Sequence, residues 1–355
     1  MIEQIRRNID ASLASFLNTV KKEYKLHLVS PLLFESIREF TLREGKRIRP
    51  LLLILTYKGY APAGKKIARK LYNASTCMEF LHNFMLIHDD IIDRSDLRRG
   101  KPTLHKILAR TVKTADADKL GIDLGIIAGD IVYALAIDAF LSIDAPLERK
   151  ERALKYFIQT AAFTAMGEFI DTVHGVSAIH DVREKDVFLN YTLKTARYTF
   201  DCPMVTGAIL AGADEREIKK LSGLGLCIGQ AFQIQDDIIG IYGTEEKIGK
   251  SILSDLAESK KTLLVCHANR VLKGKAKTEF LKIFGKPKKN LRDLEAVKKI
   301  FVGAGSLDYA LNAVAVRLQK SQNILTGLNM HPQYKNLIGA SLLKLFSQSQ
   351  AIAQR

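Results

Sequence analysis

Residues 84–93 read Phe-Met-Leu-Ile-His-Asp-Asp-Ile-Ile-Asp, an apolar run that passes into three aspartates. On a helix, residues four apart lie on one face, so Asp89 and Asp93 would direct two carboxylates to one place, about 6 Å apart along the axis. Magnesium takes oxygen ligands and bridges a few carboxylates to substrate phosphates. We therefore interpret the stretch as a helix that carries a metal-binding acidic motif, and not as a chance acidic turn.

The helical period continues along most of the chain. Apolar residues recur at three- and four-residue intervals, as in Ile2, Ile5, Ile9, Leu13, Phe16, Leu17 and Val20. Strand alternation is nearly absent, and there are only 8 prolines. We predict an all-α fold of roughly a dozen helices joined by short loops. Because no Gly/Ser/Pro-rich linker divides the sequence, we expect one domain over residues 1–355.

Composition narrows the class of protein. Of the 355 residues, 47% are hydrophobic and 26% charged, which excludes a disordered chain. The net charge of +16 would attract nucleic acid, anionic membranes or phosphorylated substrates. The lysines of residues 260–299 are not interleaved with aromatics, which favours a solvated surface. We expect no nucleic-acid partner.

The apolar segments and the cysteines indicate where the protein is located. The most apolar region, residues 120–141, is interrupted by three aspartates, so we expect no transmembrane segment. The first residues lack the apolar core of a signal peptide, which favours a cytoplasmic protein. The four cysteines show no CxxC spacing, and we expect reduced thiols and no zinc site.

A second acidic pair, Asp236-Asp237, follows the apolar stretch 228–234. If the two acidic sets faced each other, their carboxylates would repel unless cations lay between them. Their joint presence therefore predicts several metal ions, whereas a structural salt bridge would explain the second pair alone.

Basic residues accompany the acidic sets. Lys46 and Arg49 lie three apart, on one face if helical, and Arg98-Arg99-Gly100-Lys101 follows the first acidic motif closely. Arginine binds phosphate oxygens in pairs, and lysine adds a compact charge. Together these residues predict a phosphate-binding site, although each patch alone would be ordinary surface charge.

The ordered motifs together resemble the trans-isoprenyl diphosphate synthase (polyprenyl synthetase) family over about residues 40–265, most closely its archaeal-type geranylgeranyl diphosphate synthases. Any one motif is weak, but their number, order and spacing are specific. They are Gly45–Pro50, Glu79–His82, Asp89–Asp93, Arg98–Thr103, Gly129-Asp130, Gly167–Asp171, Lys194-Thr195, Gln233–Asp237 and Lys260–Thr262.

The resemblance implies a helical bundle around a central apolar cavity, a homodimer and several Mg²⁺ ions. It implies these metal ligands and supporting acids: Asp89, Asp93 and Asp236, with Asp90, Asp171 and Asp237. The implied contacts to the allylic diphosphate are Arg98, Lys194, Gln233, Lys250 and Lys260. The implied isopentenyl diphosphate pocket is Lys46, Arg49, His82 and Arg99.

The implied reaction is ionisation of an allylic diphosphate, attack by isopentenyl diphosphate and loss of a proton. Lys194 and Thr195 join the three metal-binding aspartates as catalytic residues, and the Thr195 oxygen would face the allylic cation. Two residues depart from the family pattern: Gly240 stands where many members have aspartate, and Glu168 where many have glutamine. Neither replaces a leading ligand.

The sequence also offers candidates for the residue that limits the length of the product. In this family a bulky side chain beneath the acidic motif stops the growing chain, and the candidates are Phe84, Met85 and Leu81. A helical wheel favours Met85, whereas the resemblance favours the aromatic Phe84 and a twenty-carbon product, geranylgeranyl diphosphate. A farnesyl or longer-chain synthase is the alternative.

Three other functions fit the sequence less well. A class I terpene cyclase also uses DDxxD, but it binds one diphosphate and would leave Lys46 and Arg49 without a purpose. Silent regulatory subunits of heteromeric synthases usually lose the acidic motifs, and here the first is whole. A nucleic-acid-binding protein would explain the charge but not the aspartates.

Overall fold

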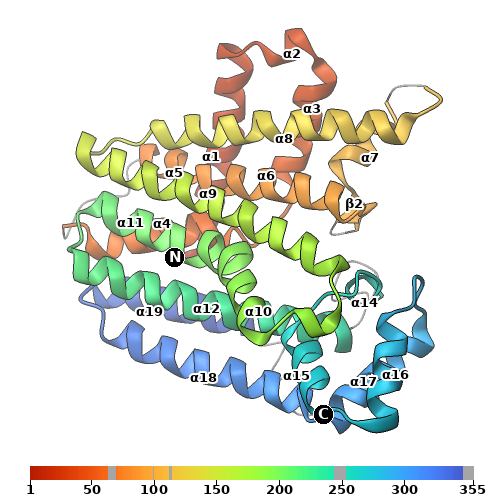
Figure 1. The fold of residues 1–355 in the computed structure, drawn as a ribbon. Coiled ribbons are helices and arrows are strands. Elements are labelled where there is room, and N and C mark those ends of the chain that lie inside the picture. Colours follow the sequence, from red (N-terminus) through yellow and green to blue (C-terminus); the bar gives the residue numbers. More distant parts are fainter. Residues whose placement is uncertain (63–68, 99, 112–113, 244–252, 347–355) are drawn as a thin grey trace. The chain divides into compact units, whose positions relative to one another are not determined.

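The computed structural model describes residues 1–62, 69–98, 100–111, 114–243 and 253–346 (Figure 1). The all-α prediction is confirmed, because helices form most of the described chain. Its first half contains α1 (Ile2–Glu23), α2 (Leu26–Val29), α3 (Pro31–Leu42), α4 (Ile48–Tyr60), α5 (Arg69–Ser75), α6 (Cys77–Ile92), α7 (Leu104–Ala109), α8 (Ala117–Leu141) and α9 (Leu147–Val176). Between α6 and α7, strands β1 (Leu97–Arg98) and β2 (Lys101–Pro102) form a short antiparallel hairpin.

The second half is also helical. It contains η1 (Ile179–Asp181), α10 (Glu184–Asn190), the π-helix η2 (Tyr191–Asp201), α11 (Cys202–Ala211), α12 (Glu215–Tyr242), α14 (Ser254–Ala257), α15 (Leu263–Val271), α16 (Gly274–Phe284), α17 (Leu291–Gly303), α18 (Ser306–Thr326), α19 (Pro332–Leu343) and η3 (Lys344–Phe346). All four cysteines are free thiols. The contacts group the chain into two compact units, and one domain over residues 1–355 stays a prediction.

Unit 1 comprises Met1–Phe157, Pro203–Asp214 and Met330–Leu337. Its centre is α6, which packs along α8 (Figure 1). Phe80 of α6 is fully buried and its ring lies 5.2 Å from that of Phe16 on α1. Burying one such side chain contributes about 1.5–3 kcal/mol, so the apolar face of α6 holds the helix in place. That packing fixes the position of the acidic residues at its carboxyl end.

Unit 2 comprises Ile158–Cys202, Glu215–Asn329 and Ile338–Arg355. Its long helix α12 packs along both η2 and α18 (Figure 1). The apolar side chains of α12 that are fully buried include Leu221, Leu224, Ala231 and Ile238. They recur at helical intervals, so one face of α12 forms the core and another carries Gln233 and Asp236.

One helix in the described chain, α8, is long and apolar enough to cross a membrane. Less than half of its most apolar window, 44%, is buried within the protein. Soluble proteins also contain core helices of this length and hydropathy. Several apolar side chains of α8 are exposed, including Ile122, Ile126 and Ile127.

Candidate active site

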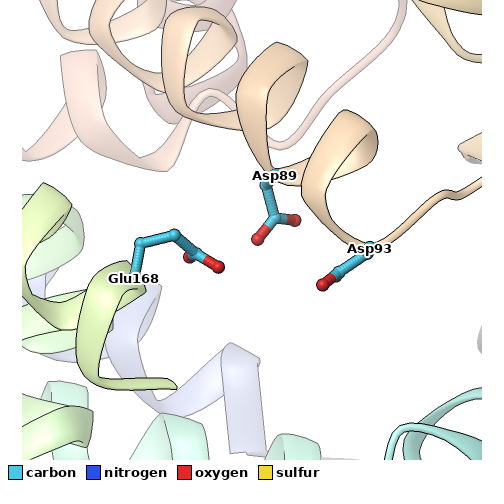
Figure 2. A group of neighbouring side chains, drawn as sticks. All are labelled: Asp89, Asp93 and Glu168. Carbon is cyan, nitrogen blue, oxygen red and sulfur yellow. The ribbon is translucent and has the colours of Figure 1, made fainter. Parts of the chain in front are cut away.

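Asp89 and Asp93 lie together where α6 ends. Asp89 is in the last turn of α6, and the N–H of Asp93 donates to its backbone carbonyl at 2.8 Å, which closes the helix. Both side chains are half-buried, and each has a carboxylate oxygen within 4.8 Å of the other. Figure 2 shows both carboxylates directed off the same end of the helix. The four-residue spacing thus places two oxygen donors side by side.

Arg98 joins this acidic end of α6 from the hairpin. Its Nη2 donates to Asp89 Oδ2 at 2.9 Å and its Nε to Asp90 Oδ1 at 2.7 Å. The hairpin turn that brings Arg98 back passes through Gly100, whose φ of 74° favours glycine. The structure therefore brings Arg98 into contact with two of the predicted aspartates.

Asp90 differs from its two neighbours because it is buried, with 1% of its surface exposed. Burial is the main cause that raises the pKa of Asp90 to about 7; Arg98 opposes the rise, and Asp89 and Asp93 add to it. Its second oxygen, Oδ2, is buried and accepts no hydrogen bond. Asp90 is therefore placed to hold Arg98, and its predicted support of a metal ion stays a prediction.

The basic loop, residues 43–47, leads into α4 and is anchored by a residue to which sequence reasoning gave no role. Arg47 has a left-handed backbone, with φ of 47°, and its side chain is buried. Its guanidinium forms ion pairs with Glu79 of α6 at 2.7 Å and with Asp10 of α1 at 2.8 Å. It also donates to the carbonyls of Thr41 and Arg43.

This anchor determines where the predicted pocket residues lie. Lys46 is exposed and Arg49 half-buried, on either side of Arg47. His82 lies three residues after Glu79, in the next turn of α6, and is buried. The Arg47–Glu79 pair therefore holds the basic loop against the part of α6 that carries His82. The sequence signal was present, since Arg47 and Glu79 belong to the quoted motifs, but their pairing could not be deduced from it.

Phe84, the candidate for chain-length control, lies among aromatic side chains of unit 1. Its ring centroid is 4.8 Å from that of Tyr133 on α8 and 4.8 Å from that of His88. Phe84 and Met85 are half-buried, whereas Leu81 is buried. Tyr133 was not predicted, and its contact with Phe84 makes a two-ring group from α6 and α8.

In unit 2, Lys194 lies between two acids of α9. Its Nζ is 2.6 Å from Asp171 Oδ2 and 2.8 Å from Glu168 Oε2, and Asn190 also donates to Asp171 at 2.8 Å. Figure 2 draws Glu168, which extends from α9. Sequence reasoning treated Glu168 only as a departure from the family pattern, whereas here it balances the charge of Lys194.

Lys194 and Thr195 lie on the π-helix η2, and two neighbouring helices approach its backbone closely. A Cβ atom at Gly167 of α9 would lie 2.5 Å from the backbone nitrogen of Lys194. A Cβ atom at Gly229 of α12 would lie 2.2 Å from Cα of Ala196. Real Cβ contacts are longer, so only glycine allows α9 and α12 to hold η2 this tightly. The position of Lys194 and Thr195 therefore depends on both glycines.

The side chains of η2 connect to the second acidic pair through hydrogen bonds. Thr195 Oγ1 donates to Gln233 Oε1 at 2.6 Å, and Gln233 Nε2 donates to Asp237 Oδ1 at 3.1 Å. Tyr191 donates its hydroxyl proton to Asp237 Oδ2. Asp236 is exposed, whereas both oxygens of the buried Asp237 accept hydrogen bonds from other side chains. Tyr191 is a further residue that the sequence did not reveal.

The structure describes only one of the three remaining predicted residues, Lys260. Lys260 forms an ion pair with Glu258 at 2.9 Å, just before α15. Arg99 and Lys250 lie outside the described residues. The structure thus builds Asp89, Asp90, Asp93 and Arg98 into one group of unit 1, and Asp171, Lys194, Thr195, Gln233 and Asp237 into linked groups of unit 2.

The chain is similar in sequence and in structure to known prenyl diphosphate synthases. The chain is 31% identical to a geranylgeranyl diphosphate synthase of Sulfolobus acidocaldarius over 88% of each chain. It is 32% identical to a geranylfarnesyl diphosphate synthase of Aeropyrum pernix, over 79% of this chain and 83% of that one. The structure of geranylgeranyl pyrophosphate synthetase from Pyrococcus horikoshii matches with a TM-score of 0.81 and 28% identity, over 98% and 97% of the two chains.

A more distant structure agrees in fold. The geranylgeranyl pyrophosphate synthase of Corynebacterium glutamicum, solved with isoprenyl diphosphate and magnesium, has a TM-score of 0.89 and 24% identity, over 98% of this chain and 99% of that one. The family model for polyprenyl synthetase matches residues 30–301. The match extends beyond the motifs on both sides and covers most of the chain, so the chain belongs to the polyprenyl synthetase family.

Proposed function

We propose that the protein is a prenyltransferase that joins an allylic diphosphate to isopentenyl diphosphate and forms geranylgeranyl diphosphate. Family membership and the named relatives support this proposal. The observation that carries it is the group formed by Asp89, Asp93 and Arg98 in unit 1, since carboxylates for cations and a guanidinium for phosphate meet at one helix end.

The donor set fits magnesium. The adjacent oxygens of Asp89 and Asp93 are hard ligands of the type that Mg²⁺ takes, and few enough to leave room for water and phosphate oxygens. We propose that Asp89, Asp93 and Asp236 hold the ions, with Asp90, Asp171 and Asp237 in support. When bound, magnesium neutralises the negative charge that develops on a departing diphosphate. A dependence on Mg²⁺ is part of the proposal.

The protein's own cations would bind the two substrates in two sets. We assign the allylic diphosphate to Arg98, Lys194, Gln233, Lys250 and Lys260, and isopentenyl diphosphate to Lys46, Arg49, His82 and Arg99. In the structure Lys194 and Arg98 each pair with two carboxylates. A diphosphate has several charged oxygens and can replace those carboxylates. On substrate binding, Lys194 and Arg98 would then form ion pairs with the diphosphate.

The reaction begins when the carbon–oxygen bond of the allylic diphosphate breaks and its electron pair leaves with the diphosphate. The Thr195 oxygen directs electron density at the resulting allylic cation, which is electrostatic stabilisation of developing charge. The double bond of isopentenyl diphosphate then forms the new carbon–carbon bond. The condensed cation then loses a proton from the adjacent carbon, which forms a double bond again. The released diphosphate accepts this proton, so no protein base is needed. Apolar walls keep water from the cation.

Phe84 supports a product of twenty carbons. Its ring, backed by Tyr133, provides a rigid aromatic surface five residues before Asp89, where the growing chain would be stopped. The relatives include both geranylgeranyl and geranylfarnesyl synthases, so a twenty-five-carbon product is the second candidate. Incubating the protein with Mg²⁺, isopentenyl diphosphate and allylic diphosphates of five, ten and fifteen carbons tests the assignment. A mainly twenty-carbon linear product supports it; a cyclic product, or chains that end at fifteen carbons, would contradict it.

We also propose that the protein is a cytoplasmic homodimer that pairs through α8. The exposed side chains of Ile122, Ile126 and Ile127, with 36%, 41% and 53% of their surface accessible, support this choice because a monomer would leave them in water. Sedimentation analysis tests it. The expected mass is twice 39.6 kDa, and Ile127→Arg should shift the distribution toward the single chain. A wild-type protein that sediments as a single chain would refute the dimer.

A further inference from the structure

We propose that Tyr191 is a positioning residue for the condensation. Its hydroxyl group holds in place the buried carboxylate of Asp237, which gives the hydrogen bonds that end at Thr195 their direction. The inference rests on the proposed function and deepens it. Tyr191 is the first residue of η2, and three residues separate it from Thr195 along the chain. Its side chain does not reach Thr195 directly, and acts through Asp237 and Gln233.

The direction of each hydrogen bond follows from the chemistry of its partners. The backbone N–H of Leu263 donates to the Tyr191 oxygen at 2.9 Å, so the hydroxyl proton is left to point at Asp237. A carboxylate can only accept, so Gln233 must present its amide nitrogen to Asp237, at 3.1 Å. The Gln233 oxygen is therefore turned to Thr195, and it can only accept.

Thr195 is the end of this chain of bonds. Because the Gln233 oxygen is an acceptor, the Thr195 hydroxyl must donate to it, at 2.6 Å. The Thr195 proton is thus held on the side of Gln233, and its lone pairs are left for another partner. An allylic cation needs such lone pairs, because a proton aimed at it would repel it. The polarity that the Asp237 carboxylate sets, while Tyr191 holds it in place, is the one that the proposed reaction requires.

Burial keeps water away from Tyr191 and Asp237. Tyr191 exposes 5% of its surface and Asp237 7%. The hydroxyl is therefore shielded from water where it donates to Asp237 and accepts from Leu263. A phenylalanine at this position would remove the donor without a change of shape.

Tyr191 also connects the network to the neighbourhood of Lys260. Leu263, which donates to it, is the first residue of α15, and Thr262 caps that helix by accepting from the N–H of Val265. Lys260 lies three residues before Leu263, in the segment that leads into the helix. One hydroxyl therefore contacts both the carboxylate that orients Gln233 and the start of the helix that follows Lys260.

The test compares Tyr191→Phe with Tyr309→Phe. Tyr309 is a matched control because its hydroxyl also donates to a carboxylate, Glu184, at 2.6 Å in unit 2, outside this network. With Mg²⁺, isopentenyl diphosphate and farnesyl diphosphate, Tyr191→Phe should lower kcat by about 10- to 100-fold, the range for a lost hydrogen bond to a charged group. KM for isopentenyl diphosphate should stay within about twofold, and Tyr309→Phe should match wild type.

A double-mutant cycle separates positioning from a purely structural effect. In a Thr195→Val background the hydroxyl that the network orients is gone, so adding Tyr191→Phe should change kcat by less than about twofold. An unreduced penalty in that background, or a Tyr191→Phe enzyme as fast as Tyr309→Phe, would overturn the inference. A wild-type protein without condensation activity would instead remove the proposed function, which is a distinguishable outcome.

A second variant is decisive if Tyr191→Phe does not fold, as judged by circular dichroism. Asp237→Asn keeps the shape but can donate to Gln233, which would reverse the amide of Gln233 and the proton of Thr195. Its kcat should fall at least tenfold and stay low at saturating Mg²⁺. Recovery of full activity at high Mg²⁺ would mean that Asp237 acts on metal binding alone, and would overturn the inference.

Discussion

Replacing Arg47 should separate the stability of unit 1 from the proposed binding of isopentenyl diphosphate. The side chains of Arg47 and Glu79 each expose only 4% of their surface, and their charged atoms are 2.7 Å apart. Arg47→Met leaves Glu79 buried without its cation, which costs about 3–5 kcal/mol of unfolding free energy. Asp10, the second partner, exposes 54% of its side chain, so Asp10→Ala should cost at most about 1 kcal/mol.

The double variant Arg47→Met/Glu79→Met provides the sharper comparison. Replacing a buried ion pair by apolar side chains of similar volume is often neutral, so its stability should return to within about 1 kcal/mol of wild type. The basic loop would still lack its anchor, because Arg47 also holds the carbonyls of Thr41 and Arg43. KM for isopentenyl diphosphate should therefore stay raised about tenfold or more in both variants.

Urea denaturation followed by circular dichroism gives the stabilities, and steady-state kinetics at saturating farnesyl diphosphate give KM. Wild-type KM in the double variant would refute the role of Arg47 in positioning the loop. Wild-type stability in the single variant Arg47→Met would refute the buried ion pair itself.

Three further changes test other parts of the site. Asp89→Asn should lower turnover about a hundredfold or more, and a chelator should abolish wild-type activity until Mg²⁺ is added back; activity that persists in chelator would contradict the metal proposal. Phe84→Ser should give products longer than twenty carbons, whereas Met85→Ala should not, and an unchanged product distribution from folded Phe84→Ser protein would remove Phe84 as the stop. Gly167→Ala would place a methyl group 2.5 Å from the backbone nitrogen of Lys194, so kcat should fall about tenfold or more, and wild-type kcat would show that η2 can yield there.

Local patterns predicted the parts of the site that depend on neighbours in sequence. Asp89 and Asp93 lie side by side because the helical period alone places them there. Arg98 reaches them because a two-strand hairpin with glycine in its turn returns the chain to the end of α6. In both cases the relevant residues are separated by fewer than ten positions, so short-range geometry was enough.

Pairings between distant residues could not be predicted in this way. Tyr191 and Asp237 are 46 positions apart, and Arg47 and Glu79 are 32 apart. Such contacts depend on how whole helices pack, and that packing cannot be deduced from a single sequence. Glu168 shows the same limit, since only the fold reveals that its carboxylate balances Lys194.

The π-helix was also beyond sequence reasoning. Hydrophobic periodicity over a segment of 11 residues does not distinguish a π-helix from an α-helix. Gly167 and Gly229 lie where neighbouring helices hold it, because these helices approach the backbone of η2 more closely than a Cβ atom allows. A glycine within an apolar helix can therefore indicate that the helix packs closely against the backbone of another.

The stoichiometry of the reaction tests the central proposal most directly. Purified protein would be given Mg²⁺, farnesyl diphosphate and radiolabelled isopentenyl diphosphate, and released diphosphate and labelled prenyl product would be measured over time. Condensation requires one diphosphate released for each isopentenyl unit incorporated, and no diphosphate release when isopentenyl diphosphate is omitted. Release of diphosphate that does not depend on isopentenyl diphosphate, with no label in the product, would contradict the assignment of this protein as a prenyltransferase.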